Sequence, residues 1–376
     1  MAFGLIAATA ASAAEFQVHG LLDLVAAQRG EAYESNLFMR GDSPFDAYRL
    51  RLFADAQVSE RMQIFSQIVL DDATSPYVDG AYLLFTPMLS RDAHVIAGKV
   101  PWAIGTYAPR TYSNKNPLVG TPLMYQYHTT LLWWSVEPNA DALLAKSGTG
   151  QAGYNGHGMT LVDDSYWDVG ITITGSERPL EYAIGLVAGT PGWGSTTQDE
   201  NSGKSVLGRI GLAPWPGIRL GCSGAYGPYL MQSVGPSLPQ GRDANDYHQK
   251  LGMADVELLV GHVELRAEGA RNLWETPNVG ELGVTSGYGE LKYSLSFGAF
   301  LAGRYDVLRF DEIEDSGGNK RPWDSNVERY EAGAGYRFNR NTVAKAIYQR
   351  TSVKTEGAPE ENRRAALAAA QVSVSF

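Results

Sequence analysis

The 376-residue sequence contains a single cysteine, Cys222, so no intramolecular disulfide can form. It has no run of about 18 consecutive apolar residues after residue 14, which excludes a protein that spans a membrane with helices. Apolar residues at helical spacing are scarce, which argues against a helical soluble protein of this size. Acidic residues outnumber basic ones, 41 against 31. The resulting net charge of −10 argues against nucleic acid as a partner.

Familiar catalytic and metal-binding motifs are also incomplete. The six histidines stand singly, with no pair at the spacing of a zinc site, so no metal and no cofactor is predicted. Residues 221–225 approach the Gly-x-Ser-x-Gly pattern of hydrolases but lack its last glycine and lie in a strand-like segment. Residues 203–205 read Gly-Lys-Ser without the upstream glycine of a phosphate loop. The acidic run 311–315 lacks EF-hand spacing and is interpreted as a solvated loop. No catalytic residue is predicted, and the protein is predicted not to be an enzyme.

The sequence is rich in glycine and aromatic residues, with 42 Gly, 20 Tyr and 8 Trp. Its hydrophobic residues alternate with polar ones. In residues 46–58 the even positions from Tyr48 onward are apolar or aromatic, whereas most odd positions are charged or polar and include Arg49, Arg51 and Asp55. Residues 263–268, 329–338 and 371–376 alternate in the same way. A period of two predicts strands with one apolar and one polar face.

The lengths of the links between these strands also alternate. Short links with turn chemistry occur at 59–61, 88–92, 175–179, 213–217, 260–262, 293–296 and 339–341. Longer links occur at 30–44, 72–77, 101–159, 190–204, 230–247, 273–281, 310–326 and 352–366. Seven turns and eight loops join sixteen strands. We therefore predict an all-β fold: one closed, antiparallel, 16-stranded transmembrane β-barrel over residues 15–376. Its turns would be periplasmic and its long loops extracellular, with residues 15–29 pairing to 366–376.

The first 14 residues are uncharged and largely apolar, and they end in small residues. This pattern is typical of the apolar region and cleavage site of a secretory signal. No Lys or Arg precedes the apolar stretch, so the signal is interpreted as truncated. A disordered apolar N-terminus is the alternative.

These features together resemble the general porins of Gram-negative outer membranes. They are a secretion signal, a first strand directly after it, sixteen alternating segments, a long third loop and a terminal Phe376. The resemblance covers the whole mature chain as a pattern rather than as a local motif. It implies location in the bacterial outer membrane, contact with lipid and lipopolysaccharide, and assembly as a homotrimer. It also implies that the barrel-assembly machinery reads the terminal strand through Val372, Val374 and Phe376.

In that family the third loop folds into the lumen and forms a constriction, which the resemblance implies for residues 101–159. The loop departs from the family by its length and by lacking an acidic cluster. Its charged residues include Arg110, Lys115, Glu137, Asp141 and Lys146, three basic and two acidic.

The polar face supplies the predicted pore-lining residues. A basic wall at Arg49 and Arg51 would oppose an acidic patch on later strands, and such charges set ion preference in a narrow passage. The alternative is that the charges only hydrate a wide lumen or pair across strands. The predicted pore-lining residues are Asp23, Arg49, Arg51, Asp55, Arg209, Asp255, Glu257, Glu264, Arg266, Glu268, Arg304, Arg329, Glu331 and Arg337.

The sequence therefore predicts a passive, water-filled channel for small hydrophilic solutes or ions. A barrel enzyme, either a lipase or a protease, is one alternative, with His262 and Glu264 as its nearest candidate pair. A loop-mediated adhesin or receptor is another. The solute and the sign of ion selectivity do not follow from the sequence.

Overall fold

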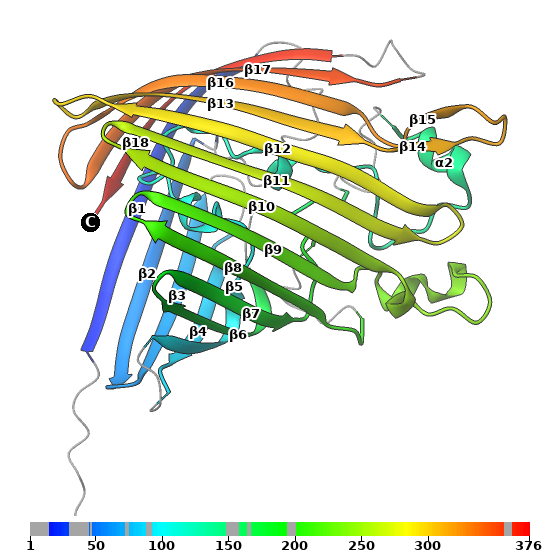
Figure 1. Ribbon diagram of the computed structural model, residues 1–376, viewed down its shortest axis with the longest axis horizontal. Helices are drawn as coiled ribbons and strands as arrows, with labels where there is room; N and C mark the ends of the chain where they lie inside the picture. The colour runs from blue at the N-terminus through cyan, green and yellow to red at the C-terminus, as the bar shows by residue number, and fades with distance from the viewer. Residues whose placement is uncertain are drawn as a thin grey trace, which may run out of the picture.

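The computed structural model describes residues 15–29, 45, 47–71, 75–87, 92–147, 158–163, 167–193, 201–356 and 363–376. Sixteen strands of these residues form one closed antiparallel barrel, which confirms the predicted fold (Figure 1). The signal predicted at residues 1–14 lies outside the described residues. No helix in the described part of the chain is long and apolar enough to cross a membrane.

Neighbouring strands in the chain are neighbours in the barrel, and the first strand closes on the last. Leu21 pairs with Ser375 and Arg29 pairs with Leu367, as predicted. The barrel strands are β1 (Glu15–Arg29), β2 (Tyr48–Ser59), β3 (Met62–Asp71), β4 (Tyr77–Phe85), β5 (Ala93–Pro101), β6 (Trp167–Glu177), β7 (Leu180–Val187), β8 (Ser205–Trp215), β9 (Ile218–Pro228), β10 (His248–Val260), β11 (Val263–Thr276), β12 (Gly280–Ser294), β13 (Ala299–Phe310), β16 (Asn326–Arg337), β17 (Thr342–Lys354) and β18 (Arg363–Ser375).

The remaining elements belong to the long links. Residues 102–166 join β5 to β6 and contain η3 (Ala108–Arg110), α1 (Leu123–Gln126) and α2 (Ala140–Leu144). The β9–β10 link contains η5 (Gln232–Ser237) and η6 (Ala244–Asp246). A small hairpin of β14 (Glu312–Glu314) and β15 (Lys320–Pro322) stands where the sequence predicted only a loop. Figure 1 shows this hairpin and α2 at one end of the barrel, which we call the loop end; the opposite end is the turn end.

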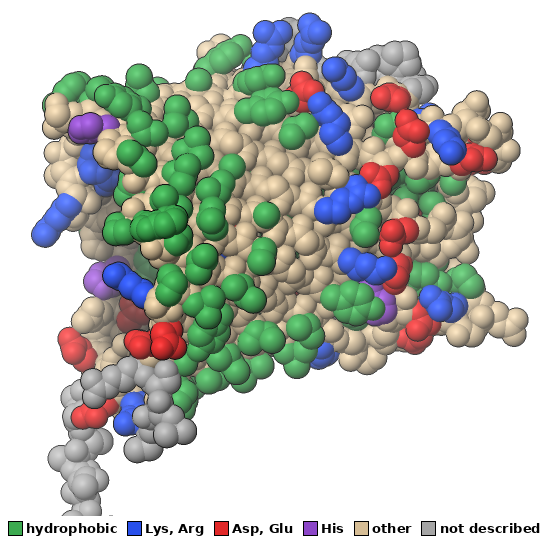
Figure 2. Space-filling model, in the orientation of Figure 1, with side chains coloured by type: hydrophobic (Ala, Val, Ile, Leu, Met, Phe, Trp, Pro, Cys, Tyr) green, Lys and Arg blue, Asp and Glu red, His purple; other side chains and the backbone are tan. Residues whose placement is uncertain are grey.

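The outer face of the barrel is apolar toward the turn end. In β7 the outward positions are Leu180, Tyr182, Ile184 and Leu186, all exposed. Successive strand residues point to opposite sides, so the residues between them face the interior. Figure 2 shows hydrophobic side chains over the turn-end side of the visible face. A band of this kind is the surface that a transmembrane barrel presents to lipid.

The polarity of several strands reverses along their length. In β13, Tyr305 is exposed on the outside while Arg304 and Asp306 are buried inside. Farther toward the loop end the order changes, because Phe310 is buried inside and Arg309 lies outside, paired with Glu328. Figure 2 shows Lys, Arg, Asp and Glu side chains gathered over this end. The apolar outer band therefore stops short of the loop end, where the outer wall is charged.

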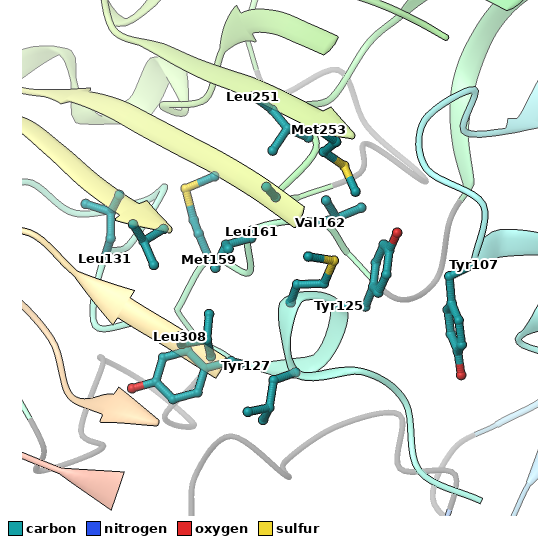
Figure 3. Close-up of a cluster of buried hydrophobic side chains, with 14 of the residues drawn as sticks. Tyr107, Tyr125, Tyr127, Leu131, Met159, Leu161, Val162, Leu251, Met253 and Leu308 are labelled. Carbon is teal, nitrogen blue, oxygen red and sulfur yellow. The ribbon is translucent and has the colours of Figure 1, made fainter. Parts of the chain in front are cut away.

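The interior near the loop end is a hydrophobic core, whereas the sequence predicted a wet lumen. Described residues of the β5–β6 link supply the centre of this core. The inner faces of β10–β13 supply much of the surrounding wall, with further apolar residues from β5, β7–β9 and β16–β18. Figure 3 shows Tyr125, Met159 and Leu161 from the β5–β6 link among Met253 and Leu308 from the wall. The core forms here because the link is rich in apolar residues and meets the part of the wall whose inner face is also apolar.

Candidate functional site

The β5–β6 link is fastened to the inner wall of the barrel by charged side chains. Lys345 of β17 donates from Nζ to three carbonyl oxygens of the link, those of Ser113, Asn116 and Leu118, at 2.8, 3.0 and 2.9 Å. A single ammonium group therefore satisfies three carbonyls over six residues of loop.

Two arginines extend this contact toward α1. Arg304 of β13 donates from Nη2 to the carbonyl of Gly120 at 2.7 Å, and Arg329 of β16 donates to the carbonyl of Thr121. Carboxylates bind the amides of the same stretch. The Gly120 amide donates to Glu331 at 2.9 Å. The wall therefore binds both the carbonyl oxygens and an amide group of the link backbone.

These wall residues also bind one another. Arg304 contacts Glu331 at 2.6 Å and Glu290 at 3.3 Å, and both Arg304 and Arg329 contact Asp306, at 3.3 and 3.4 Å. All five side chains are buried. The predicted pore-lining residues Arg304, Arg329 and Glu331 therefore hold the link in place and are covered by it.

A second anchor lies on β11. Glu268 accepts hydrogen bonds from the Thr106 amide at 2.6 Å and from the hydroxyl groups of Thr106 and Tyr125. Burial, together with the charge of Glu268, raises the pKa of Tyr125 well above its usual value. Tyr125 therefore stays a neutral donor, and its ring stacks on Tyr107.

A third anchor binds the link near the loop end of the barrel. Asp324, between β15 and β16, accepts from the Thr130 amide at 2.8 Å and from the Tyr127 hydroxyl at 3.0 Å. Burial raises the pKa of Asp324 to about 6, although these hydrogen bonds and one from the Ser325 amide act in the opposite direction.

The charged residues predicted for the constriction separate into two groups. Arg110 contacts Glu290 at 3.2 Å and donates to the Tyr288 hydroxyl at 2.7 Å. Lys115, which is exposed, also lies on the interior side. The others lie among the outer loops: Lys146 pairs with Glu137, and Asp141 accepts from the Ser316 amide at 2.9 Å in the β14–β15 hairpin.

Between the link and the opposite wall lies a cavity of about 730 Å³. One side is formed by residues 101–121 of the link, and the other by inner faces of β2–β4 and β6–β11. Its described lining residues carry seven cations and three carboxylates, namely Arg49, Arg51, Arg110, Lys115, Arg209, Arg219 and Arg266 with Asp79, Glu181 and Glu257. We call this space the cationic cavity.

Ion pairs organise the wall of the cationic cavity. Arg209 of β8 contacts Asp255 of β10 at 2.6 Å, and Arg219 of β9 pairs with Glu181. Arg266 of β11 contacts Glu257 at 3.4 Å. The predicted acidic patch on β10 and β11 is therefore interleaved with arginines of its own.

The remaining predicted pore residues lie nearer the turn end or beside the first strand. Arg51 contacts Asp23 at 3.3 Å. Asp55 is partly buried on β2. Arg337 donates to the Asn114 carbonyl at 3.1 Å. Glu264 contacts Lys292 at 2.7 Å and Arg266 at 3.0 Å.

Sequence reasoning missed several interior charges that the structure shows to matter. Arg219 stands between apolar Ile218 and Leu220, and Lys345 stands between Ala344 and Ala346. The same alternation that identified Arg49 and Arg51 would have assigned both to the inner face. Among the described residues, no group of three or more His, Cys, Asp or Glu could hold a metal ion.

The chain has the architecture of known outer-membrane proteins. It is 14% identical to OmpF of Salmonella typhi, solved in complex with daunomycin, with a TM-score of 0.58 over 96% of this chain and 97% of that one. An anion-selective porin from Comamonas acidovorans is 9% identical, with a TM-score of 0.58 over 96% of this chain and 100% of the porin. The trimer form of OmpT from Vibrio cholerae is 11% identical, with a TM-score of 0.57 over 97% and 100%.

No protein-family model matches the sequence, and no curated protein does. The structural likeness at these identities establishes the fold. The chain has the closed 16-stranded β-barrel fold of these outer-membrane porins.

Proposed function

We propose that the protein is a passive channel of the bacterial outer membrane for small hydrophilic solutes or ions, and that solutes pass through the cationic cavity. The observation that carries this proposal is a charged cavity inside a closed barrel whose outer face is apolar toward the turn end. An apolar exterior suits lipid, and an interior lined by charged groups suits water and polar solutes.

The passage is narrower than a barrel of sixteen strands allows. The β5–β6 link fills part of the interior, and its core at the loop end also includes wall residues of β7–β9 and β16–β18. The open space is the cationic cavity, which lies between residues 101–121 and the inner faces of β2–β4 and β6–β11. A solute must therefore pass between the link segment 101–121 and that wall. This arrangement supports a constriction formed by the third long loop.

Two neighbouring residues of β7 allow a matched test. Ala183 lines the cationic cavity, whereas Ile184 points outward and is 55% exposed. In planar bilayers, Ala183→Trp should lower single-channel conductance by about half or more, because the indole obstructs a narrow passage. Ile184→Trp should leave conductance unchanged. An absence of channels in the folded wild-type chain, or equal conductance in the two variants, would overturn the proposal.

We propose a channel rather than a barrel enzyme or a receptor. The pair considered for catalysis does not form a catalytic unit: Glu264 is held by Lys292 and Arg266, and the His262 ring lies against Tyr293. We further propose that the protein forms a homotrimer, supported by the trimer form recorded for an OmpT of the same fold. Chemical cross-linking of the protein in native membranes, followed by mass measurement, tests this.

A further inference from the structure

The charges on the cationic cavity are unbalanced. Its described lining carries seven cations against three carboxylates, although the whole chain carries a net charge of −10. Charges beyond about 8 Å are largely screened at physiological salt, so a permeating ion responds to the cavity lining more than to the chain as a whole. The positive cavity lining thus favours anions, whereas the negative charge of the whole chain would favour cations.

Some of the carboxylates that pair with these cations are less exposed than the cations themselves. The Arg209 side chain is 15% exposed, and that of its partner Asp255 is 1% exposed. Arg219 is 53% exposed and its partner Glu181 30%. At these two pairs a solute in the cavity meets the guanidinium group before the carboxylate, whereas Arg266 and Glu257 are equally exposed, at 21% each. The ion pairs fix the arginines in place while their remaining N–H groups stay accessible.

The cations also surround the passage. Arg209, Arg219 and Arg266 project from β8, β9 and β11. Arg49 and Arg51 project from β2, and Arg110 and Lys115 from the link. A planar guanidinium group matches the two oxygens of a carboxylate or phosphate, which a chloride ion cannot exploit. Several such groups around one cavity supply the donors that a small oxyanion needs.

We propose that the cationic cavity is an anion-selective passage with a weak binding site for small oxyanions, carboxylates or phosphates. This inference rests on the proposed channel function and adds the sign of its selectivity and the chemistry of its solute. Fixed positive charge raises the local concentration of anions and excludes cations from a narrow passage.

The test measures the reversal potential of the full-length wild-type protein in planar bilayers across a tenfold KCl gradient. We expect chloride to permeate better than potassium. In the double variant Arg219→Gln/Lys115→Gln, the chloride-to-potassium permeability ratio should fall at least about twofold. Both side chains are exposed, so their replacement leaves the buried anchors of the link intact. The control Lys250→Gln/Arg309→Gln removes two cations from the outer wall and should leave the ratio unchanged.

Inorganic phosphate and acetate then probe the oxyanion site. Each, added at millimolar concentration, should reduce the chloride current of the wild-type channel, and the double variant should be less sensitive. Channels that prefer potassium, or a ratio equal in wild type and double variant, would overturn the inference and leave the channel function standing. Oxyanion block that is equal in both chains would overturn the binding site. A folded wild-type barrel without any conductance would overturn the channel itself.

Discussion

Asp324 shows how the environment of one buried carboxyl group connects link docking to pH. It is almost completely buried and holds the Thr130 amide and the Tyr127 hydroxyl of the β5–β6 link. Its pKa is about 6, above the ordinary value near 3.8 that it regains on unfolding. The folded chain therefore holds the Asp324 proton more tightly than the unfolded chain does. The corresponding stabilisation is complete below about pH 4 and is lost as the pH rises through 6.

We predict that Asp324→Asn removes this pH dependence. The shift of about two pH units corresponds to about 3 kcal/mol, since one unit is about 1.4 kcal/mol. Between pH 4 and pH 7 the unfolding free energy of wild type should fall by about that amount relative to the variant, whose amide cannot ionise. Denaturant unfolding of both chains in detergent micelles at pH 4, 5.5 and 7 measures the difference. Parallel pH profiles would contradict the assignment.

At the scale of elements, a strand of this barrel has two amphipathic stretches rather than one. In β13 the inner face changes from Arg304 and Asp306 to Leu308 and Phe310, and the outer face changes from Tyr305 to Arg309. The two stretches differ in what their inner and outer faces contact. The turn-end stretch has a charged interior and an apolar exterior, whereas the loop-end stretch has the link core inside and a charged exterior.

This reversal explains why the sequence predicted the barrel but did not predict the hydrophobic core inside it. Strand number, antiparallel order and closure of β1 on β18 followed from period-two alternation and from the alternation of link lengths. The hydrophobic core could not be predicted in this way. Alternation shows that Leu308 and Arg309 face opposite sides of the sheet, but it does not show which side is inside the barrel. That choice depends on the β5–β6 link, whose contacts join residues far apart in sequence.

The link itself depends strongly on Lys345. Replacement by methionine keeps the length of the side chain but removes the donor for the carbonyls of Ser113, Asn116 and Leu118. Three buried acceptors lose a charged partner, at a cost of at least about 3 kcal/mol. We predict that amide hydrogen exchange in residues 105–123 accelerates by about 100-fold or more, while exchange of the barrel strands changes little.

Lys250→Met is the matched control for this prediction. Lys250 lies on the outer wall and contacts Glu275 at 2.6 Å and Glu281 at 3.3 Å. An exposed ion pair contributes less than about 1 kcal/mol, so exchange in residues 105–123 should remain as in wild type. If Lys345→Met also leaves this exchange unchanged, the lysine contacts do not anchor the link.

At the scale of the whole molecule, the barrel wall is one strand thick, and its turn-end part has an apolar outer face and a charged inner face. Apart from the turns and the register shifts beside them, successive strand residues at the turn end point alternately to the apolar outer face and to the interior. The same new side chain should therefore cost different amounts of stability at adjacent positions. Ala183 and Ile184 of β7 provide that comparison, since Ala183 lines the cationic cavity and Ile184 lies on the apolar outer face.

We predict that Ile184→Arg lowers the unfolding free energy by about 2–4 kcal/mol, because the guanidinium group must enter lipid. Ala183→Arg places the same group beside water and the Glu181 carboxylate. Its cross-strand neighbour is Arg209, so a like-charge cost of up to about 1 kcal/mol is expected there. Urea unfolding of both variants in lipid vesicles, followed by tryptophan fluorescence, measures the two costs. Equal destabilisation would mean that the two faces of β7 do not meet different solvents, and the membrane-spanning orientation of the wall would be wrong.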